Sequence, residues 1–273
     1  MLAVFVEEPG YDLQRTLLTA AGCRLKLLPV DNEGMDVTKA AKHHGVKAAF
    51  VTPSHQFPLG YTMSATRRLM LLNWAQTSGA WIVEDDYDSE YRFDTRPIPS
   101  LQGLDVNARV IYIGTFSKIL FPSLRIGYVV IPRDLVEHFA AVRLAMDIFP
   151  PYLYQEVLAD FMEQGHFGRH VRKMRQILGE RRNALMDSIR NEFGDMLEVH
   201  GSSAGMHVSV TLPAGFNDRE ITIRASRERM WLWPLSRYYA GKRARHGFVL
   251  GFGSTPTEQI PSAVKHMRAL VSG

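Results

Sequence analysis

The chain has 273 residues, of which 46% are hydrophobic and 22% are charged, a composition that excludes a disordered chain, a collagen or a coiled coil. Its single cysteine, Cys23, excludes an internal disulfide and a zinc site built from several cysteines, and it fits a reducing compartment. The formal net charge of +4 is weak evidence for contact with nucleic acid or a membrane surface.

The first half of the chain alternates short apolar strands with amphipathic helices. Strands are expected at residues 2–7, 24–29, 48–52, 81–84, 110–114 and 125–131, and helices at 11–21 and 64–78. Ser64 is a suitable cap for the second helix, and Gly79 ends it. Strands that are apolar on both faces and alternate with helices predict a mostly parallel sheet that is covered on both sides.

The pattern changes after the prolines at 150 and 151. Helices are expected at residues 155–163, 169–193 and 257–271, and strands at 206–212, 230–233 and 248–252. Glycines at 165 and 168 interrupt the first two helices, and Trp231 and Trp233 are expected to pack on at least one face of their strand. The sequence therefore predicts an α/β protein, with a three-layer α/β/α large domain over 1–165 and a small α+β domain over 166–273.

Polar side chains follow three of the predicted parallel strands. They are His55 and Gln56 after the strand at 48–52, Asp85 and Tyr87 after the strand at 81–84, and Thr115, Ser117 and Lys118 after the strand at 110–114. In an open parallel sheet, ligands bind at the carboxyl ends of the strands. We therefore expect a ligand site at this edge.

The segment GTFSK carries the most specific chemistry. A lysine with a lowered pKa forms Schiff bases, so Lys118 is a candidate nucleophile. The hydroxyls of Thr115 and Ser117 can bind phosphate oxygens, and Arg125 can bind a phosphate through two parallel hydrogen bonds.

Two side chains after the strand at 81–84 fit the same kind of site. A carboxylate such as Asp85 can pair with a pyridinium nitrogen, which makes the ring an electron sink. Tyr87 lies two residues further on, so it points the same way along an extended chain and can donate to a ring oxygen.

Two other kinds of site are less well supported. The acids from Glu84 to Glu90 could hold a divalent metal. However, we expect Asp85 and Tyr87 to face one side and Glu84, Asp86 and Asp88 the other, so no metal site is predicted. The basic residues between 169 and 182 could contact nucleic acid, but on a helix they would form a solvated face opposite the apolar stripe.

The motifs EEPGYD, VTPSHQFPLG, VEDDYDSEYR, GTFSKILFPSLRIGY and SAGMHV, in this order, resemble the fold type I pyridoxal-phosphate enzymes of the aspartate aminotransferase superfamily. They are most similar to the aminotransferase-like domain of MocR-type regulators of the GntR family. The resemblance runs along almost the whole chain but starts part-way through the family's large domain, so we expect an N-terminally truncated domain. It implies pyridoxal 5′-phosphate as cofactor, an amino acid or amine as ligand, and a homodimer with sites near the interface.

The resemblance also implies roles for individual residues. Lys118 would hold the cofactor as a Schiff base and exchange it for an external aldimine with the ligand. Asp85 would pair with the ring nitrogen and Tyr87 would donate to the ring oxygen. Thr115, Ser117 and Arg125 would bind on the phosphate side.

Two family positions differ in this sequence. The asparagine of the family's NPTG-like turn is missing from the segment QFPLG, so its contact with the ring oxygen would come from His55 or Gln56, or would be lost. The usual carboxylate-binding arginine is missing from the stretch 247–251, and Arg237 is the candidate substrate anchor.

Three functions are consistent with these features. They are an enzyme that completes transamination, a sensor that controls an attached DNA-binding domain, and a non-functional fragment. No helix-turn-helix is visible, so direct nucleic-acid binding by this chain is not expected. No apolar run reaches the ~20 residues of a membrane span, and the start lacks a basic region followed by an apolar one, so we expect a cytoplasmic protein without membrane contact.

Overall fold

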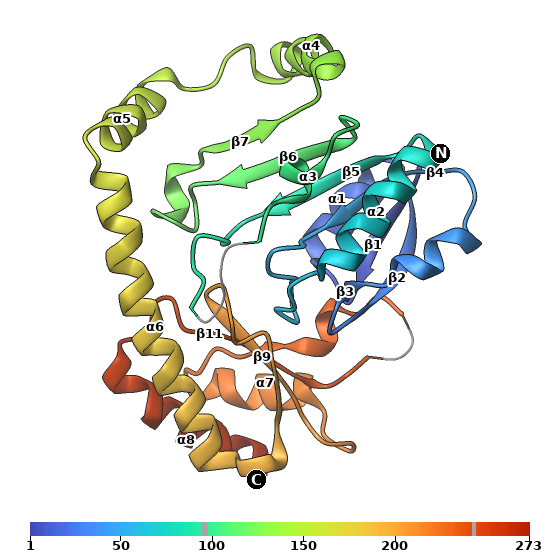
Figure 1. The fold of residues 1–273 in the computed structure, drawn as a ribbon. Coiled ribbons are helices and arrows are strands. Elements are labelled where there is room, and N and C mark those ends of the chain that lie inside the picture. The colour runs from blue at the N-terminus through green and yellow to red at the C-terminus, as the bar shows by residue number, and fades with distance from the viewer. Residues whose placement is uncertain (94–97, 242–243) are drawn as a thin grey trace.

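The computed structural model describes residues 1–93, 98–241 and 244–273, which form two sheets and the helices around them (Figure 1). The larger sheet contains β1 (Ala3–Glu8), β2 (Arg24–Asp31), β3 (Gly34–Met35), β4 (Val46–Val51), β5 (Trp81–Asp86), β6 (Val110–Thr115) and β7 (Gly127–Val130). The smaller sheet contains β8 (Glu198–His200), β9 (His207–Thr211), β10 (Trp233–Pro234) and β11 (Gly247–Gly251). The α-helices are α1 (Asp12–Ala20), α2 (Ala65–Ser78), α3 (Leu101–Leu104), α4 (Val136–Asp147), α5 (Tyr152–Glu163), α6 (His166–Phe193), α7 (Asp218–Arg227) and α8 (Ile260–Ser272).

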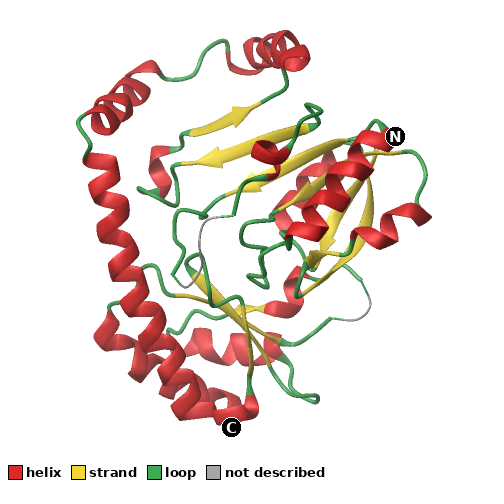
Figure 2. Cartoon of the chain, in the orientation of Figure 1, coloured by secondary structure: helices red, strands yellow, loops and turns green. Residues whose placement is uncertain are grey.

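The larger sheet is mostly parallel, with the strand order β3-β2-β1-β4-β5-β6-β7. Strands β2, β1, β4, β5 and β6 run parallel, and β3 and β7 pair antiparallel at the two edges. Alternate residues of β1 pack on opposite helices, because successive strand side chains point to opposite faces. Phe5 packs in the cluster that contains Leu71 of α2, whereas Val4 packs with Leu18 of α1. The predicted three-layer α/β/α architecture is therefore confirmed (Figure 2).

The ends of α2 follow from its sequence. The Ser64 hydroxyl accepts a hydrogen bond from the backbone N–H of Arg67, which is the usual N-cap contact. Gly79 adopts a φ of 63° and ends the helix in the left-handed conformation that glycine accepts at no steric cost. Both predicted boundary signals are confirmed.

One edge of the larger sheet differs from the prediction of a sheet covered on both sides. The strand expected at 125–131 is the shorter β7, which is antiparallel and exposed along its whole length. Beyond it, α4 has no buried residue, and α5 buries only Leu158 (Figure 1). We call residues 121–163 the apolar arm, because large apolar side chains from Phe121 to Met162 face solvent there. No described helix combines the length and the apolarity needed to cross a bilayer.

The second sheet has its own core. Its antiparallel strands, in the order β10-β11-β9-β8, pack with α6, α7 and α8 around residues such as Leu178, Val210 and Phe248. Helix α6 starts at His166 and not at 169, because only Gly165, with a φ of 72°, breaks the helical backbone. The domain boundary at 165/166 therefore falls at the start of α6, and it stays a prediction.

The tryptophans of the small unit are not packed as expected. The strand predicted at 230–233 is reduced to β10, a two-residue edge strand that pairs only with β11. Trp231 is 82% exposed and Trp233 is 51% exposed, so the expected packing was wrong. Trp231 lies before this short strand, and Trp233 begins it at the edge of the sheet.

The basic face of α6 is exposed from Arg169 to Arg175, as predicted, and half-buried at Arg181 and Arg182. Arg175 donates to the carbonyl oxygen of Glu90 at 2.7 Å, and Arg181 donates to the carbonyl oxygen of Gly253. Both arginines attach the long helix to neighbouring loops, but only the second is half-buried, so the predicted solvated face holds at Arg175 and fails at Arg181.

Candidate functional site

The carboxyl ends of four neighbouring parallel strands meet at one edge of the larger sheet. Glu7 is the penultimate residue of β1, Thr52 follows β4, Asp85 lies near the end of β5, and Thr115 ends β6. The register pairs Asp85 with Ile113, so the acid lies beside the strand that leads into the GTFSK segment. The edge thus collects most of the side chains that the sequence singled out.

Two buried carboxyl groups lie at this edge. Burial raises the pKa of Asp85 to about 6, with a further contribution from the neighbouring charges of Asp86 and Asp88. Burial raises the pKa of Glu7 to about 7, although its Oε2 accepts a hydrogen bond of 2.7 Å from the Thr52 hydroxyl. The other oxygen, Oε1, is buried without a hydrogen-bond partner among the described residues. Sequence reasoning missed Glu7, although an acid at the end of a buried strand is a usable signal.

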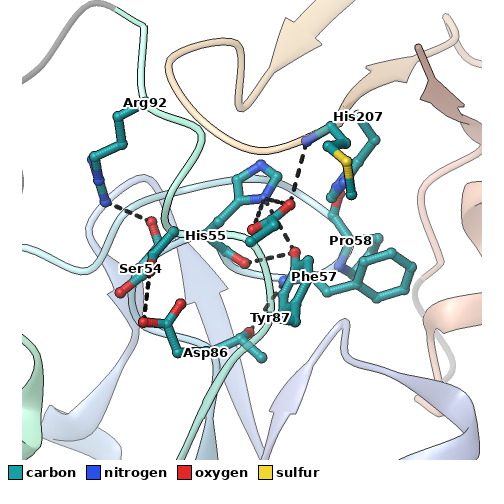
Figure 3. Close-up of polar contacts among 12 residues, drawn as sticks. Ser54, His55, Phe57, Pro58, Asp86, Tyr87, Arg92 and His207 are labelled. Carbon is teal, nitrogen blue, oxygen red and sulfur yellow. Dashed lines mark hydrogen bonds and ion pairs between the residues drawn. The ribbon is translucent and has the colours of Figure 1, made fainter. Parts of the chain in front are cut away.

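Tyr87 belongs to a compact polar cluster with His55, Asp88 and His207, and Figure 3 shows how Tyr87, His55 and His207 lie within it. Its hydroxyl donates to the carbonyl oxygen of His55 at 2.8 Å and lies 3.1 Å from His55 Nδ1. Burial raises the pKa of this hydroxyl well above its usual value, so it keeps its proton. The two carboxylate oxygens of Asp88 lie 3.1 and 3.0 Å from the same nitrogen. Asp88 therefore reaches the same partner as Tyr87, and its predicted placement on the opposite side was wrong.

The small sheet closes the other side of this cluster. The rings of His207 and His55 are 4.5 Å apart between centroids, and the backbone N–H of Met206 donates to Asp88 at 3.3 Å. Burial lowers the pKa of His207 to about 3, so this ring is neutral, and its Nε2 lies 3.0 Å from the carbonyl oxygen of Pro58. The cluster is thus assembled from β9 and from the loops after β4 and β5.

Three side chains of this cluster, those of His55, Asp88 and His207, are of the kinds that bind metal ions. One ligand atom from each of His55, Asp88 and His207 lies within 4.8 Å of the others. However, Asp88 is hydrogen-bonded to His55, and His207 to a backbone carbonyl. The absence of a metal stays a prediction.

The turn after β6 gathers three of the predicted phosphate-side residues. The Thr115 hydroxyl accepts a hydrogen bond of 3.1 Å from the backbone N–H of Ser117. The backbone N–H of Phe116 donates to Ile126, which brings Arg125 back beside the start of the turn. Arg125 has a φ of 52° and forms no ion pair with the part of the chain that the structure describes. These groups form a cationic, hydroxyl-bearing turn of the kind that accepts an anion.

Lys118 is exposed and lines an open groove with a volume of about 1190 Å³. The groove also contacts His170, Met206 and Trp231, so it runs between the turn after β6 and the small unit. Met206, which lines the same groove, donates its backbone N–H to Asp88 at 3.3 Å. The groove that Lys118 lines therefore borders a residue that contacts the polar cluster of His55, Asp88 and His207.

Gln56 and His55 are each 1% exposed, so the structure does not present either side chain to a ligand. The Gln56 amide donates to the carbonyl oxygens of Pro9 and Phe57, at 2.9 and 2.6 Å. It therefore holds the turn after β4 against the end of β1.

Arg237 lies in a 3₁₀ turn after β10, where its Nε donates to Asp12 at 2.7 Å and its guanidinium lies over Trp233. Close to this turn, the ring of Tyr11 packs edge-to-face on Phe57, with ring centroids 5.5 Å apart, and Phe57 packs in the same way on Tyr238. Sequence reasoning missed Tyr11, which directly precedes α1.

Comparison with known proteins gives a consistent result. The model of aminotransferase class I and II matches residues 2–233. The chain is 38% identical to the probable rhizopine catabolism regulatory protein MocR of Rhizobium meliloti, over 97% of this chain and 54% of that protein. It is 33% identical to the HTH-type transcriptional regulator YdeL of Bacillus subtilis, over 98% and 58%. The structure of a multiple substrate aminotransferase from Thermococcus profundus is similar, with a TM-score of 0.91 and 27% identity over 99% of this chain and 69% of that one. The chain spans about half the length of these curated relatives.

Proposed function

Because this chain belongs to the class I and II aminotransferase family, we propose that it binds pyridoxal 5′-phosphate through a covalent bond to Lys118. The observation that supports this proposal is the pairing of β5 with β6, which places Asp85 beside Ile113, while Tyr87 follows β5 and Lys118 follows β6 at the same edge of the sheet. Each of these groups has the chemistry that one part of the cofactor requires.

The donor set fits the cofactor. Thr115, Ser117 and Arg125 supply hydroxyl and guanidinium groups for a phosphate, and Arg125 has no competing carboxylate among the described residues. The carboxyl of Asp85 suits a protonated ring nitrogen, and a positive partner there would favour its ionised form. Because His55 and Gln56 are buried, we assign the contact with the ring oxygen to Tyr87.

When bound, the cofactor supplies an electron sink for negative charge that develops next to the amino group of a substrate. Asp85 would hold the charge of the ring nitrogen, and Tyr87 would orient the ring. The Lys118 Nζ, exposed to the groove, would take up a proton and return it once a ligand amine has displaced it. We propose Arg237 as the anchor of a ligand carboxylate, for which Asp12 now stands in.

A second function, sensing of an amino acid or amine without net transamination, is favoured by one observation. The two curated relatives described above carry the names of transcriptional regulators and match 97% and 98% of this chain. In that case ligand binding would act on a DNA-binding domain elsewhere in a longer protein, in the cytoplasm.

The exposed apolar arm supports association of two copies of the chain, since monomeric proteins rarely expose apolar surface of this extent.

The test is an absorbance titration of the purified chain with pyridoxal phosphate. We expect a visible band that Lys118→Ala abolishes and that Lys173→Ala, at an exposed position on α6, leaves unchanged. Addition of an amino acid and a 2-oxo acid then separates the two functions. Turnover of both supports the enzyme, whereas a spectral shift without product supports the sensor. The absence of any band that depends on Lys118 refutes cofactor binding by this chain.

A further inference from the structure

His55 is enclosed to an extent that its sequence position does not suggest. Gly60 and Gly205 pack against its ring, both with positive φ. A Cβ at Gly205 would lie 2.0 Å from His55 Cε1, and a Cβ at Gly60 would lie 3.0 Å from Nε2. Two glycines are therefore needed to fit this imidazole between the large sheet and the small unit.

The two nitrogens of this ring are in different situations. Nδ1 faces both oxygens of Asp88, so it carries the proton, because a carboxylate only accepts. Nε2 is then a buried acceptor, and it has no hydrogen-bond partner among the described residues. Leaving a polar atom buried and unpaired costs stability, and a hydrocarbon side chain would avoid this cost. The unpaired Nε2 therefore gives no reason for a histidine at position 55, and the reason must lie in the contacts of Nδ1.

The Nδ1 side contacts Tyr87. His55 contacts the Tyr87 hydroxyl at two points. The hydroxyl donates to the His55 carbonyl oxygen at 2.8 Å, and its oxygen lies 3.1 Å from His55 Nδ1. Asp88 fixes the ring that makes the second contact, and Asp88 is itself fixed by the backbone N–H of Met206. The hydroxyl thus has a defined position, while its single proton can turn toward another acceptor at the edge.

We propose that His55, held by Asp88, is a positioning residue that orients the Tyr87 hydroxyl toward the ring oxygen of the cofactor. The inference rests on the proposed function for the identity of that acceptor. Its geometry does not depend on the cofactor, because the contacts exist within the chain itself. His55 acts through Tyr87 and does not touch the ligand.

The first arm of the test needs no cofactor. Side-chain ¹H–¹⁵N spectra of the ¹⁵N-histidine chain should show His55, assigned by its loss in His55→Asn, with the proton on Nδ1. Tyr87→Phe removes the hydroxyl and should shift the His55 Nδ1 signal, whereas His44→Asn, an exposed control, should leave it unchanged. A His55 signal that Tyr87→Phe does not move overturns the proposal, whether or not the cofactor binds.

The second arm measures the affinity for pyridoxal phosphate. The amide nitrogen of His55→Asn occupies the place of Nδ1, so this variant should bind like the wild type. The amide nitrogen of His55→Gln occupies the place of Nε2, so this variant should bind about five- to tenfold more weakly, as for the loss of one hydrogen bond. If His55 acts through Tyr87, then the double variant with Tyr87→Phe should bind no more weakly than Tyr87→Phe alone.

The outcomes separate the two proposals. The positioning role is overturned, even if the cofactor binds, by either of two results. One is a double variant whose loss of affinity is the product of the two single losses. The other is a His55→Asn variant that binds pyridoxal phosphate as weakly as His55→Gln. A wild-type chain without a Lys118-dependent band refutes the proposed function, and the spectral arm then decides the role of His55 alone.

Discussion

Replacing Glu7 with glutamine should change how the stability of the protein depends on pH. Glu7 is 5% exposed, and burial raises the pKa of its carboxyl from 4.5 to about 7. Between these values the folded chain keeps the proton that the unfolded chain has released. The stabilisation by this proton is complete below pH 4.5 and is lost as the pH rises through about 7.

The shift in pKa corresponds to about 3 kcal/mol. Glu7→Gln cannot ionise, so its stability relative to the wild type should rise by about 2 to 3 kcal/mol between about pH 5 and about pH 8. The exchange also alters the hydrogen bond with Thr52, but that change adds a constant offset at every pH. The pH-dependent part therefore isolates the buried charge.

Urea unfolding followed by tryptophan fluorescence measures both free energies of unfolding at each pH. Glu258→Gln, at an exposed position, serves as the matched control and should show no such trend. The difference in free energy of unfolding between Glu7→Gln and the wild type could instead stay constant with pH. That result would show that burial does not raise the pKa of Glu7. The reasoning from burial would then be refuted.

Three further substitutions test other parts of the structure. Arg68 is 0% exposed and donates to three backbone carbonyls, so Arg68→Met should lower the free energy of unfolding by about 3–5 kcal/mol; a loss below about 1 kcal/mol contradicts this. Gly205→Ala should lower the thermal midpoint far more than Gly22→Ala. Both glycines have a φ above 70°, but only at Gly205 would the added Cβ meet other atoms. Equal effects of the two substitutions would argue against close packing at Gly205. Arg237→Gln should change stability by less than about 1 kcal/mol, since its pair with Asp12 is partly exposed, yet weaken binding of amino acids more than of amines without a carboxylate; equal weakening contradicts the anchor role.

The sequence predicts those features that depend on local signals. Apolar strands, the Ser64 cap and the glycine at 79 determine the parallel sheet and α2 over short distances. The rule that ligands bind at strand ends also selects Asp85 and Lys118 without knowledge of the partners of either. These features follow from periodicity and capping, so they can be predicted without tertiary contacts.

The remaining features depend on contacts between distant segments. His55 meets Asp88 across 33 residues, and Asp88 meets Met206 across 118, so neither pairing has a local signal. The exposure of Trp231 was missed because an apolar alternation does not reveal that the strand is only two residues long and begins after Trp231. The start of α6 was missed because a glycine inside a helix costs only about 1 kcal/mol relative to alanine, so Gly168 does not interrupt it.

The apolar arm also determines how the protein behaves in concentrated solution. Sulfate and phosphate ions strengthen the association of apolar surfaces, and the arm presents such a surface from β7 to α5. A net charge of +4 on 273 residues gives little repulsion between molecules, and salt screens much of it. We therefore expect the chain to salt out at low sulfate concentration, and charged substitutions on the outer face of α4 to raise its solubility without touching the candidate site.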